Sequence, residues 1–160
     1  MPRAPAPTRR APVPALVAIV AIFALAGCSG LVEGRPTPTP QDFGGIVAAL
    51  GAAGVFVQNP TSGDAGCPDP NLIPTAIRFE ATGPGLTSPV VLRAYIFGDR
   101  TSWERRRPDV DACDATWATD LATFETVDSS PYVVAGQGPW PAVFKAAIRS
   151  ALIAAAGNGG

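Results

Sequence analysis

The chain has 160 residues, enough for one domain with its own hydrophobic core. Apolar residues make up 47% of it and argue against wholesale disorder, while its twelve basic and thirteen acidic residues nearly balance. There is no basic excess of the kind that nucleic-acid-binding proteins use, so we expect no nucleic-acid partner. Histidine is absent, which excludes His-based catalytic triads and HExxH zinc sites.

The N-terminus has the pattern of an export signal. Basic residues precede an apolar run at residues 13–26, and they are Arg3, Arg9 and Arg10. A membrane-spanning helix needs about 20 apolar residues, so this shorter run is typical of a signal peptide. The run ends in the stretch Leu25-Ala26-Gly27-Cys28.

Leu25-Ala26-Gly27-Cys28 resembles the lipobox of bacterial lipoproteins. The resemblance implies that residues 1–27 are removed as a signal peptide and that Cys28 is lipidated. It implies membrane lipid as a partner through the acyl group, and anchoring on the extracytoplasmic side of a bacterial membrane. Ordinary cleavage near Ala26 and an uncleaved anchor are the alternatives. Without residues 1–27 the chain keeps nine basic and thirteen acidic residues, a net charge of −4.

Residues 28–42 contain the run Arg35-Pro36-Thr37-Pro38-Thr39-Pro40. Alternating prolines favour a polyproline II conformation, which rises about 3.1 Å per residue without internal hydrogen bonds. Such a segment has no apolar face to bury in a core. We therefore expect residues 28–42 to be a semi-rigid tether and residues 43–160 to be one globular domain.

Residues 43–160 carry both helical and strand patterns. Apolar residues at helical spacing predict a first helix, which Asp42 caps and Gly54 ends. Two alternating runs around a Gly/Pro-rich connection predict an antiparallel hairpin, whose second strand is apolar on both faces and belongs in the middle of the sheet. The expected elements are a helix at 43–54, strands at 55–57, 75–82 and 89–97, helical segments between Thr101 and Leu121, strands at 123–127 and 131–135, and a last helix from Pro139. We predict an α+β fold with an antiparallel sheet of four to five strands and three to four helices mainly on one face.

The middle helical region carries two local signals. Thr101 and Glu104 have the spacing of a capping box, which predicts Thr101 as the N-cap. Pro108 lacks the backbone N–H that a helix interior needs, so we expect it to interrupt the helix and a second helical piece to follow.

The other two cysteines predict a disulfide. If Cys28 carries lipid, Cys67 and Cys113 remain as a pair in an oxidising compartment. A redox or metal pair is the alternative, but the two lack a C-x-x-C spacing and the chain has no histidine. We expect a structural bridge that closes a loop of about 46 residues and stabilises the domain by about 4 kcal/mol.

Four side chains of the predicted hairpin share its less apolar face, and they are Arg78, Glu80, Arg93 and Tyr95. A carboxylate between two guanidiniums beside a phenol could bind a ligand or polarise a small substrate, so these residues form a candidate ligand patch. Cross-strand charge pairing that keeps an open sheet face soluble is the alternative.

Asp109, Asp111 and Asp114 form an acidic cluster, with Asp120 further on. An EF-hand loop would use Asp109, Asp111 and Asp120 as positions 1, 3 and 12. It would need glycine where Asp114 stands, and an oxygen ligand where Cys113 stands. We therefore expect a solvated helix start and no metal site.

These features favour a non-enzymatic binding or scaffolding module without a cofactor, whose partner is an envelope protein or a small molecule. One alternative is a small enzyme that uses Glu80 or the carboxylates of Asp109, Asp111 and Asp114 as acid or base. The other is a calcium-dependent module.

Overall fold

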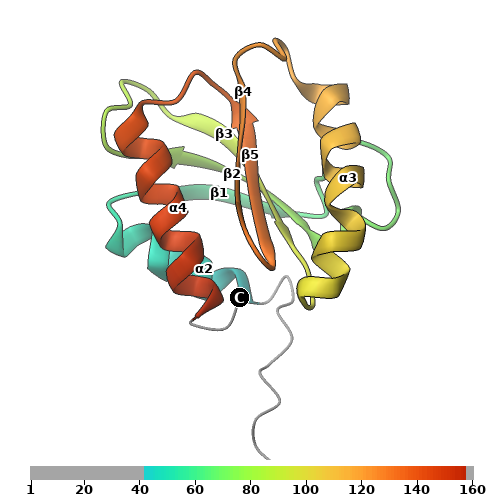
Figure 1. Cartoon of the computed structure of the whole chain (residues 1–160). Helices are drawn as coiled ribbons and strands as arrows, with labels where there is room; N and C mark the ends of the chain where they lie inside the picture. The colour runs from blue at the N-terminus through green and yellow to red at the C-terminus, as the bar shows by residue number, and fades with distance from the viewer. Residues whose placement is uncertain (1–41, 158–160) are drawn as a thin grey trace, which may run out of the picture. The chain divides into compact units, whose positions relative to one another are not determined.

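The computed structural model describes residues 42–157, which form an α+β domain with a five-stranded antiparallel sheet (Figure 1). The predicted signal peptide, Cys28 and the tether up to residue 41 lie outside the described residues. In chain order the elements are α2 (Phe43–Ala52), β1 (Phe56–Ser62), the short 3-10 helix η2 (Ile73–Thr75), β2 (Ala76–Thr82), β3 (Val90–Ile96), α3 (Arg100–Trp117), β4 (Phe124–Ser129), β5 (Tyr132–Gln137) and α4 (Ala142–Ala156).

The strands lie in the order β1-β2-β3-β5-β4, and each neighbouring pair is antiparallel. β2 and β3 form the predicted hairpin, and β4 and β5 form a second one. The central position of β3 confirms the prediction made from its apolar residues on both faces. β1 and β4 are the edge strands.

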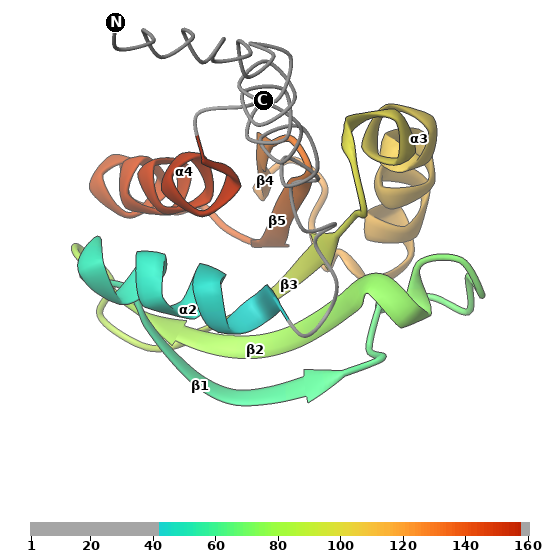
Figure 2. The ribbon, with the colours of Figure 1, turned by 90° about the horizontal axis from the view of Figure 1, so that it is seen from below.

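Alternate residues of the strands enter two separate cores. Leu92, Ala94 and Ile96 of β3 lie in the larger core with α2 and α4, whereas Tyr95 and Phe97 lie in the smaller core with α3. α2 and α4 therefore cover one face of the sheet, and α3 covers part of the other (Figure 1, Figure 2). Two of the three α-helices in the described region thus share a face, which agrees with the prediction of helices mainly on one side.

The larger core explains why α4 forms where it does. Phe144, Ile148 and Leu152 follow one another at intervals of four residues, and all three are fully buried. Ile46 and Leu50 of α2 have the same spacing and are also fully buried. Burial of each such side chain contributes roughly 1.5–3 kcal/mol, which outweighs the low helix propensity of the glycines in α2.

The prediction that Pro108 interrupts the middle helix is wrong. α3 runs without a break from Arg100 to Trp117 and contains Pro108 in its interior. Proline removes one backbone hydrogen bond, but Val110 and Cys113 on the following turns are buried against the sheet. This packing keeps the helix continuous across a residue that would end an isolated helix.

The N-cap of α3 also differs from the prediction, because it is Asp99 rather than Thr101. The Ser102 backbone N–H donates to Asp99 Oδ1 at 2.6 Å. Glu104, the other half of the expected capping box, accepts a hydrogen bond from Arg100 Nε at 2.8 Å. A carboxylate two residues earlier performs the capping, since aspartate caps a helix at least as well as threonine does.

β1 is longer than the predicted strand at 55–57. It continues to Ser62 past a register shift between Gln58 and Thr61. Asn59, whose φ of +52° lies in the left-handed region, stands at this irregularity and is followed by Pro60. These turn-forming residues therefore make a bulge within β1, and the strand continues beyond it.

Candidate functional site

The part of the sheet that α3 leaves uncovered is a candidate binding surface. Figure 2 shows the sides of β1 and β2 opposite α2 with no helix of the described region over them. Directly paired residues point to the same face, so the register of β1, β2 and β3 identifies the side chains there. We call this surface the open face, and its principal side chains are Phe56, Gln58, Thr61, Arg78, Glu80 and Val91. Phe56 is 62% exposed and Val91 is 37% exposed, which is high for apolar residues in a sheet.

The predicted ligand patch lies on this side of the sheet, but its members have different surroundings. Arg78 and Arg93 stand directly opposite each other on β2 and β3. Glu80 accepts a hydrogen bond from Asn59 Nδ2 at 3.3 Å, at the β1 edge. Tyr95 is fully buried in the smaller core. The structure therefore brings the two arginines together and places the phenol beneath α3.

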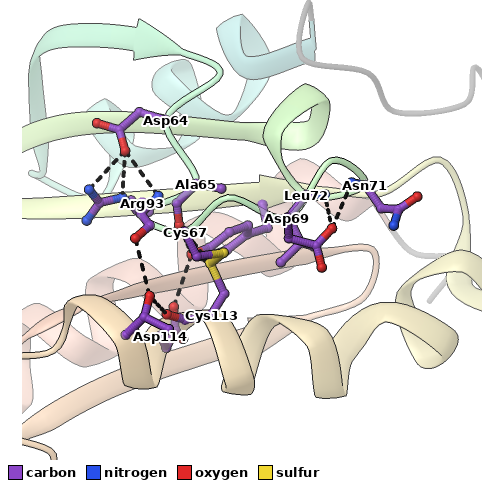
Figure 3. Close-up of a disulfide and its surroundings, with 12 residues drawn as sticks. Asp64, Ala65, Cys67, Asp69, Asn71, Leu72, Arg93, Cys113 and Asp114 are labelled. Atoms are coloured by element: carbon purple, nitrogen blue, oxygen red, sulfur yellow. Dashed lines mark hydrogen bonds and ion pairs between the residues drawn. A yellow bond between two sulfur atoms is a disulfide. The ribbon is translucent and has the colours of Figure 1, made fainter.

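The carboxylate that joins the two arginines is Asp64, which follows β1. Arg93 donates to Asp64 Oδ1 from Nε at 3.2 Å and from Nη2 at 2.9 Å (Figure 3). Arg78 Nε lies 3.9 Å from Asp64 Oδ2. Glu80 is the carboxylate that the strand pattern predicts in this position. Asp64 has no such pattern, because it lies in a turn-rich segment without periodicity, and only the folded chain brings it to the sheet.

Arg93 and Arg78 differ in how firmly they are held. The Arg93 side chain is only 12% exposed, and its guanidinium lies 4.1 Å from the centre of the Trp117 ring, in a cation–π contact. Arg78 is 30% exposed and has the longer contact to Asp64. A guanidinium presents up to five donors and matches carboxylates and phosphates in a planar, two-pronged geometry. Arg78 is thus the more exposed and less tightly held of the two arginines.

The segment 63–72 contains Asp64, and a disulfide, hydrogen bonds and a buried side chain hold it in place. Cys67 and Cys113 form a disulfide with a Cα–Cα distance of 5.4 Å, which confirms the predicted bridge (Figure 3). Asp69 Oδ1 accepts from the backbone N–H groups of Asn71 at 2.7 Å and Leu72 at 3.2 Å. Leu72 is fully buried. These contacts hold the segment between the end of the sheet and α3.

A buried polar cluster lies beside the disulfide. Tyr95 Oη is 2.8 Å from the carbonyl oxygen of Ala65 and 3.0 Å from Asp114 Oδ1. Asp114 is 3% exposed. Burial raises the pKa of Asp114 to about 7, although the hydrogen bond with Tyr95 and the charge of Arg107 oppose the shift. Burial also raises the pKa of Tyr95, so the phenol stays protonated at physiological pH.

The remaining carboxylates of the acidic cluster are paired with arginines rather than with one another. Asp109 Oδ2 accepts from Arg106 Nη1 at 3.0 Å, and Asp111 pairs with Arg107 one turn away. Asp120 is engaged separately, since its Oδ1 accepts from the Ala122 N–H at 2.9 Å.

The calcium interpretation finds no support in this arrangement. Asp109 and Asp111 lie within the continuous helix α3, not in the loop that an EF-hand requires. Among residues 42–157, no three Asp, Glu, Cys or His side chains are gathered as metal ligands.

The arrangement also gives no support to an acid or base among these carboxylates. Asp114 has the raised pKa that such a role requires, but it is enclosed by α3, Tyr95 and the loop. A cavity of about 420 Å³ in the described region lies elsewhere, between the start of α3, the β4–β5 turn and the end of α4. Its lining includes Trp103, Ser130 and Ile153 but none of the acidic residues of the cluster.

Within residues 42–157, every helix is too short or too polar to cross a membrane. Comparisons with protein-family models, with curated proteins and with solved structures find no match.

Proposed function

We propose that the chain is a lipid-anchored lipoprotein on the extracytoplasmic side of a bacterial membrane, and that its domain is a non-enzymatic binding module. The anchoring part of this proposal rests on the different roles of the three cysteines. Cys67 and Cys113 are joined, which suits an oxidising compartment. Cys28 is the cysteine left over, and it stands at the end of the lipobox-like stretch.

The open face supports the binding half of the proposal. It combines an exposed aromatic side chain, Phe56, with the partly exposed side chain of Arg78. Aromatic residues and arginine are the types most enriched at the centres of protein interfaces. Polar side chains such as Gln58 and Thr61 border them and would supply hydrogen bonds. We infer that this surface binds another envelope component through side chains of β1, β2 and β3.

Anchoring is tested by replacing Cys28 in a bacterial host with lipoprotein-processing enzymes. Wild-type protein will incorporate radiolabelled fatty acid and yield a mature N-terminus at Cys28, whereas Cys28→Ser will incorporate none. The matched control is the pair Cys67→Ser and Cys113→Ser, which removes the other thiols and will keep the label. Wild-type protein without label, or labelled Cys28→Ser, would refute the anchoring proposal.

Binding by the open face is tested with a photo-crosslinking amino acid at Phe56 in intact cells. We expect one discrete adduct, because a partner on this surface would cover the 62% exposed side chain. Val143 on α4 is 58% exposed and lies away from the open face, so the same probe there is the matched control. Arg78→Ala will reduce the Phe56 adduct about tenfold, the equivalent of about 1.4 kcal/mol. The same adducts from both positions, or none from Phe56, would contradict the proposal.

A further inference from the structure

The hydroxyl of Tyr95 has two close neighbours but only one proton to give. Ala65 presents a carbonyl oxygen at 2.8 Å, which can only accept, and Asp114 Oδ1 lies at 3.0 Å. If Asp114 were ionised, both neighbours would be acceptors, and one of the two short contacts would lack a hydrogen. If Asp114 is protonated, its carboxyl group donates to Tyr95 Oη and Tyr95 donates to Ala65. Only the protonated carboxyl therefore satisfies both contacts.

The burial of Asp114 leads to the same protonation state. Its Oδ2 is buried and has no hydrogen-bond partner, and the Trp117 Nε1–H, whose influence lowers the pKa of Asp114, has no acceptor either. An ionised carboxylate that is 3% exposed would leave a full charge with half of its acceptor capacity unfilled, at a large cost in solvation. A neutral carboxyl group carries a much smaller penalty.

The charged groups around Asp114 are already engaged with other partners. On α3 itself, Arg107 pairs with Asp111 and reaches across to β4, where its Nε donates to Asp128 Oδ1 at 2.9 Å. Arg107 therefore directs its hydrogen bonds to the carboxylates of Asp111 and Asp128.

The groups that face Asp114 from the other elements do not balance its charge either. From β3, Arg93 is bound to Asp64 of the loop and stacked on Trp117. β5 contributes Val133 and Ala135 to this core, which are apolar. Cys67 of the loop is held in the disulfide and does not titrate.

We propose that Asp114 is a pH-sensitive latch, whose proton ties α3 through Tyr95 to the start of the loop at residues 63–66. Without that proton the Tyr95 hydroxyl donates to the Asp114 carboxylate instead, so the Ala65 carbonyl loses its donor and this part of the loop is released. The disulfide at Cys67 confines the movement to the few residues before it. Asp64 lies within the released segment, so its hold on Arg93 and Arg78 weakens with it.

The latch would regulate the open face by freeing arginine donors as the pH rises. This consequence rests on the proposed binding function, whereas the latch itself does not. Because burial raises the pKa of Asp114 to about 7, the transition falls near neutral pH.

The effect on stability has a definite sign. An unfolded aspartate titrates near pH 4, and the folded group titrates near pH 7. Between these values the folded chain holds a proton that the unfolded chain has lost. The stabilisation is therefore complete below about pH 4 and is lost as the pH rises through 7. From about pH 5 to about pH 8 the melting temperature of the full-length protein will fall by about 10 °C from this group.

The direct test is infrared spectroscopy of the full-length protein in detergent during a pH titration. Wild-type protein will show the carbonyl band of a protonated, buried carboxylic acid, and this band will disappear with a midpoint near pH 7. Asp114→Asn will lack the band, which assigns it. A wild-type protein with no such band between pH 5 and 6 would overturn the proposal, even if the variant failed to fold.

Hydrogen–deuterium exchange of residues 63–67 tests the consequence for the loop. An asparagine at position 114 can donate to Tyr95 at any pH, so Asp114→Asn will keep the loop closed. At about pH 8.5 wild-type exchange will be about tenfold faster than in this variant, and at about pH 5.5 the two will agree. Tyr95→Phe will exchange fast at both values. Equal exchange in wild type and Asp114→Asn at both pH values would refute the latch, whereas failure of the Phe56 crosslink would refute only the binding function.

Discussion

Replacing Cys67 and Cys113 together by alanine will lower the free energy of unfolding by about 4 kcal/mol. The bridge closes a segment of 46 residues, and in the chain-entropy model a loop of this size restricts the unfolded state by about that amount. Domains of this size are stable by only about 5–15 kcal/mol, so the loss is a large fraction of the total. Urea denaturation of the full-length protein in detergent, followed by circular dichroism, measures it.

A reducing agent provides the control for this prediction. Reduction will lower the stability of the wild-type protein toward that of the double variant and will leave the variant unchanged. The result that contradicts the prediction is a double variant as stable as the oxidised wild-type protein. In that case the other contacts of the loop, such as Leu72 in the core, would hold α3 and the sheet together without the bridge.

Phe144→Ala will destabilise the domain by about 3–5 kcal/mol, the usual cost of a large buried aromatic ring. Phe144 is fully buried, and its ring meets Trp140 edge-on at a centroid distance of 5.8 Å. The ring also lies close to the backbone at Gly83, because a Cβ added there would lie 2.8 Å from it. The surrounding backbone therefore has little freedom to fill the cavity that the substitution leaves.

The neighbouring residue offers a matched control for Phe144. Val143 lies on the same turn of α4 but is 58% exposed, so Val143→Ala will change the stability by less than about 0.5 kcal/mol. Chemical denaturation of both variants measures the difference. Equal effects from the two would show that α4 does not pack on the sheet as described.

The fold was predictable from sequence where one periodic pattern dominated. The alternation in β2 and β3 gave their pairing and the central place of β3, because side chains of a strand point to opposite faces in turn. Local rules failed where tertiary packing opposed them. Pro108 lies inside α3 because the buried residues after it outweigh one missing hydrogen bond.

The candidate site was predictable only in part. Alternation placed Arg78 and Arg93 on one face, and the structure puts them side by side. Asp64 could not be found in this way, because it lies in an irregular segment and contacts Arg93 at a separation of 29 residues. The Ala65 carbonyl is a backbone group that every residue has, so the residue type does not indicate its role. Sequence patterns therefore identified the strand residues of the site and the bridge at Cys67, but they missed Asp64 and the Ala65 carbonyl of the loop.

The bulge in β1 has a consequence for how the domain behaves when many copies are crowded together. An edge strand offers free N–H and C=O groups, on which a neighbouring chain can build another strand and start aggregation. In β1 the positive φ of Asn59 breaks the regular edge, and Pro60 has no N–H to offer. A second copy of the domain thus cannot extend the sheet along the whole of β1. The bulge therefore lowers the tendency of the domain to aggregate through this edge at high concentration.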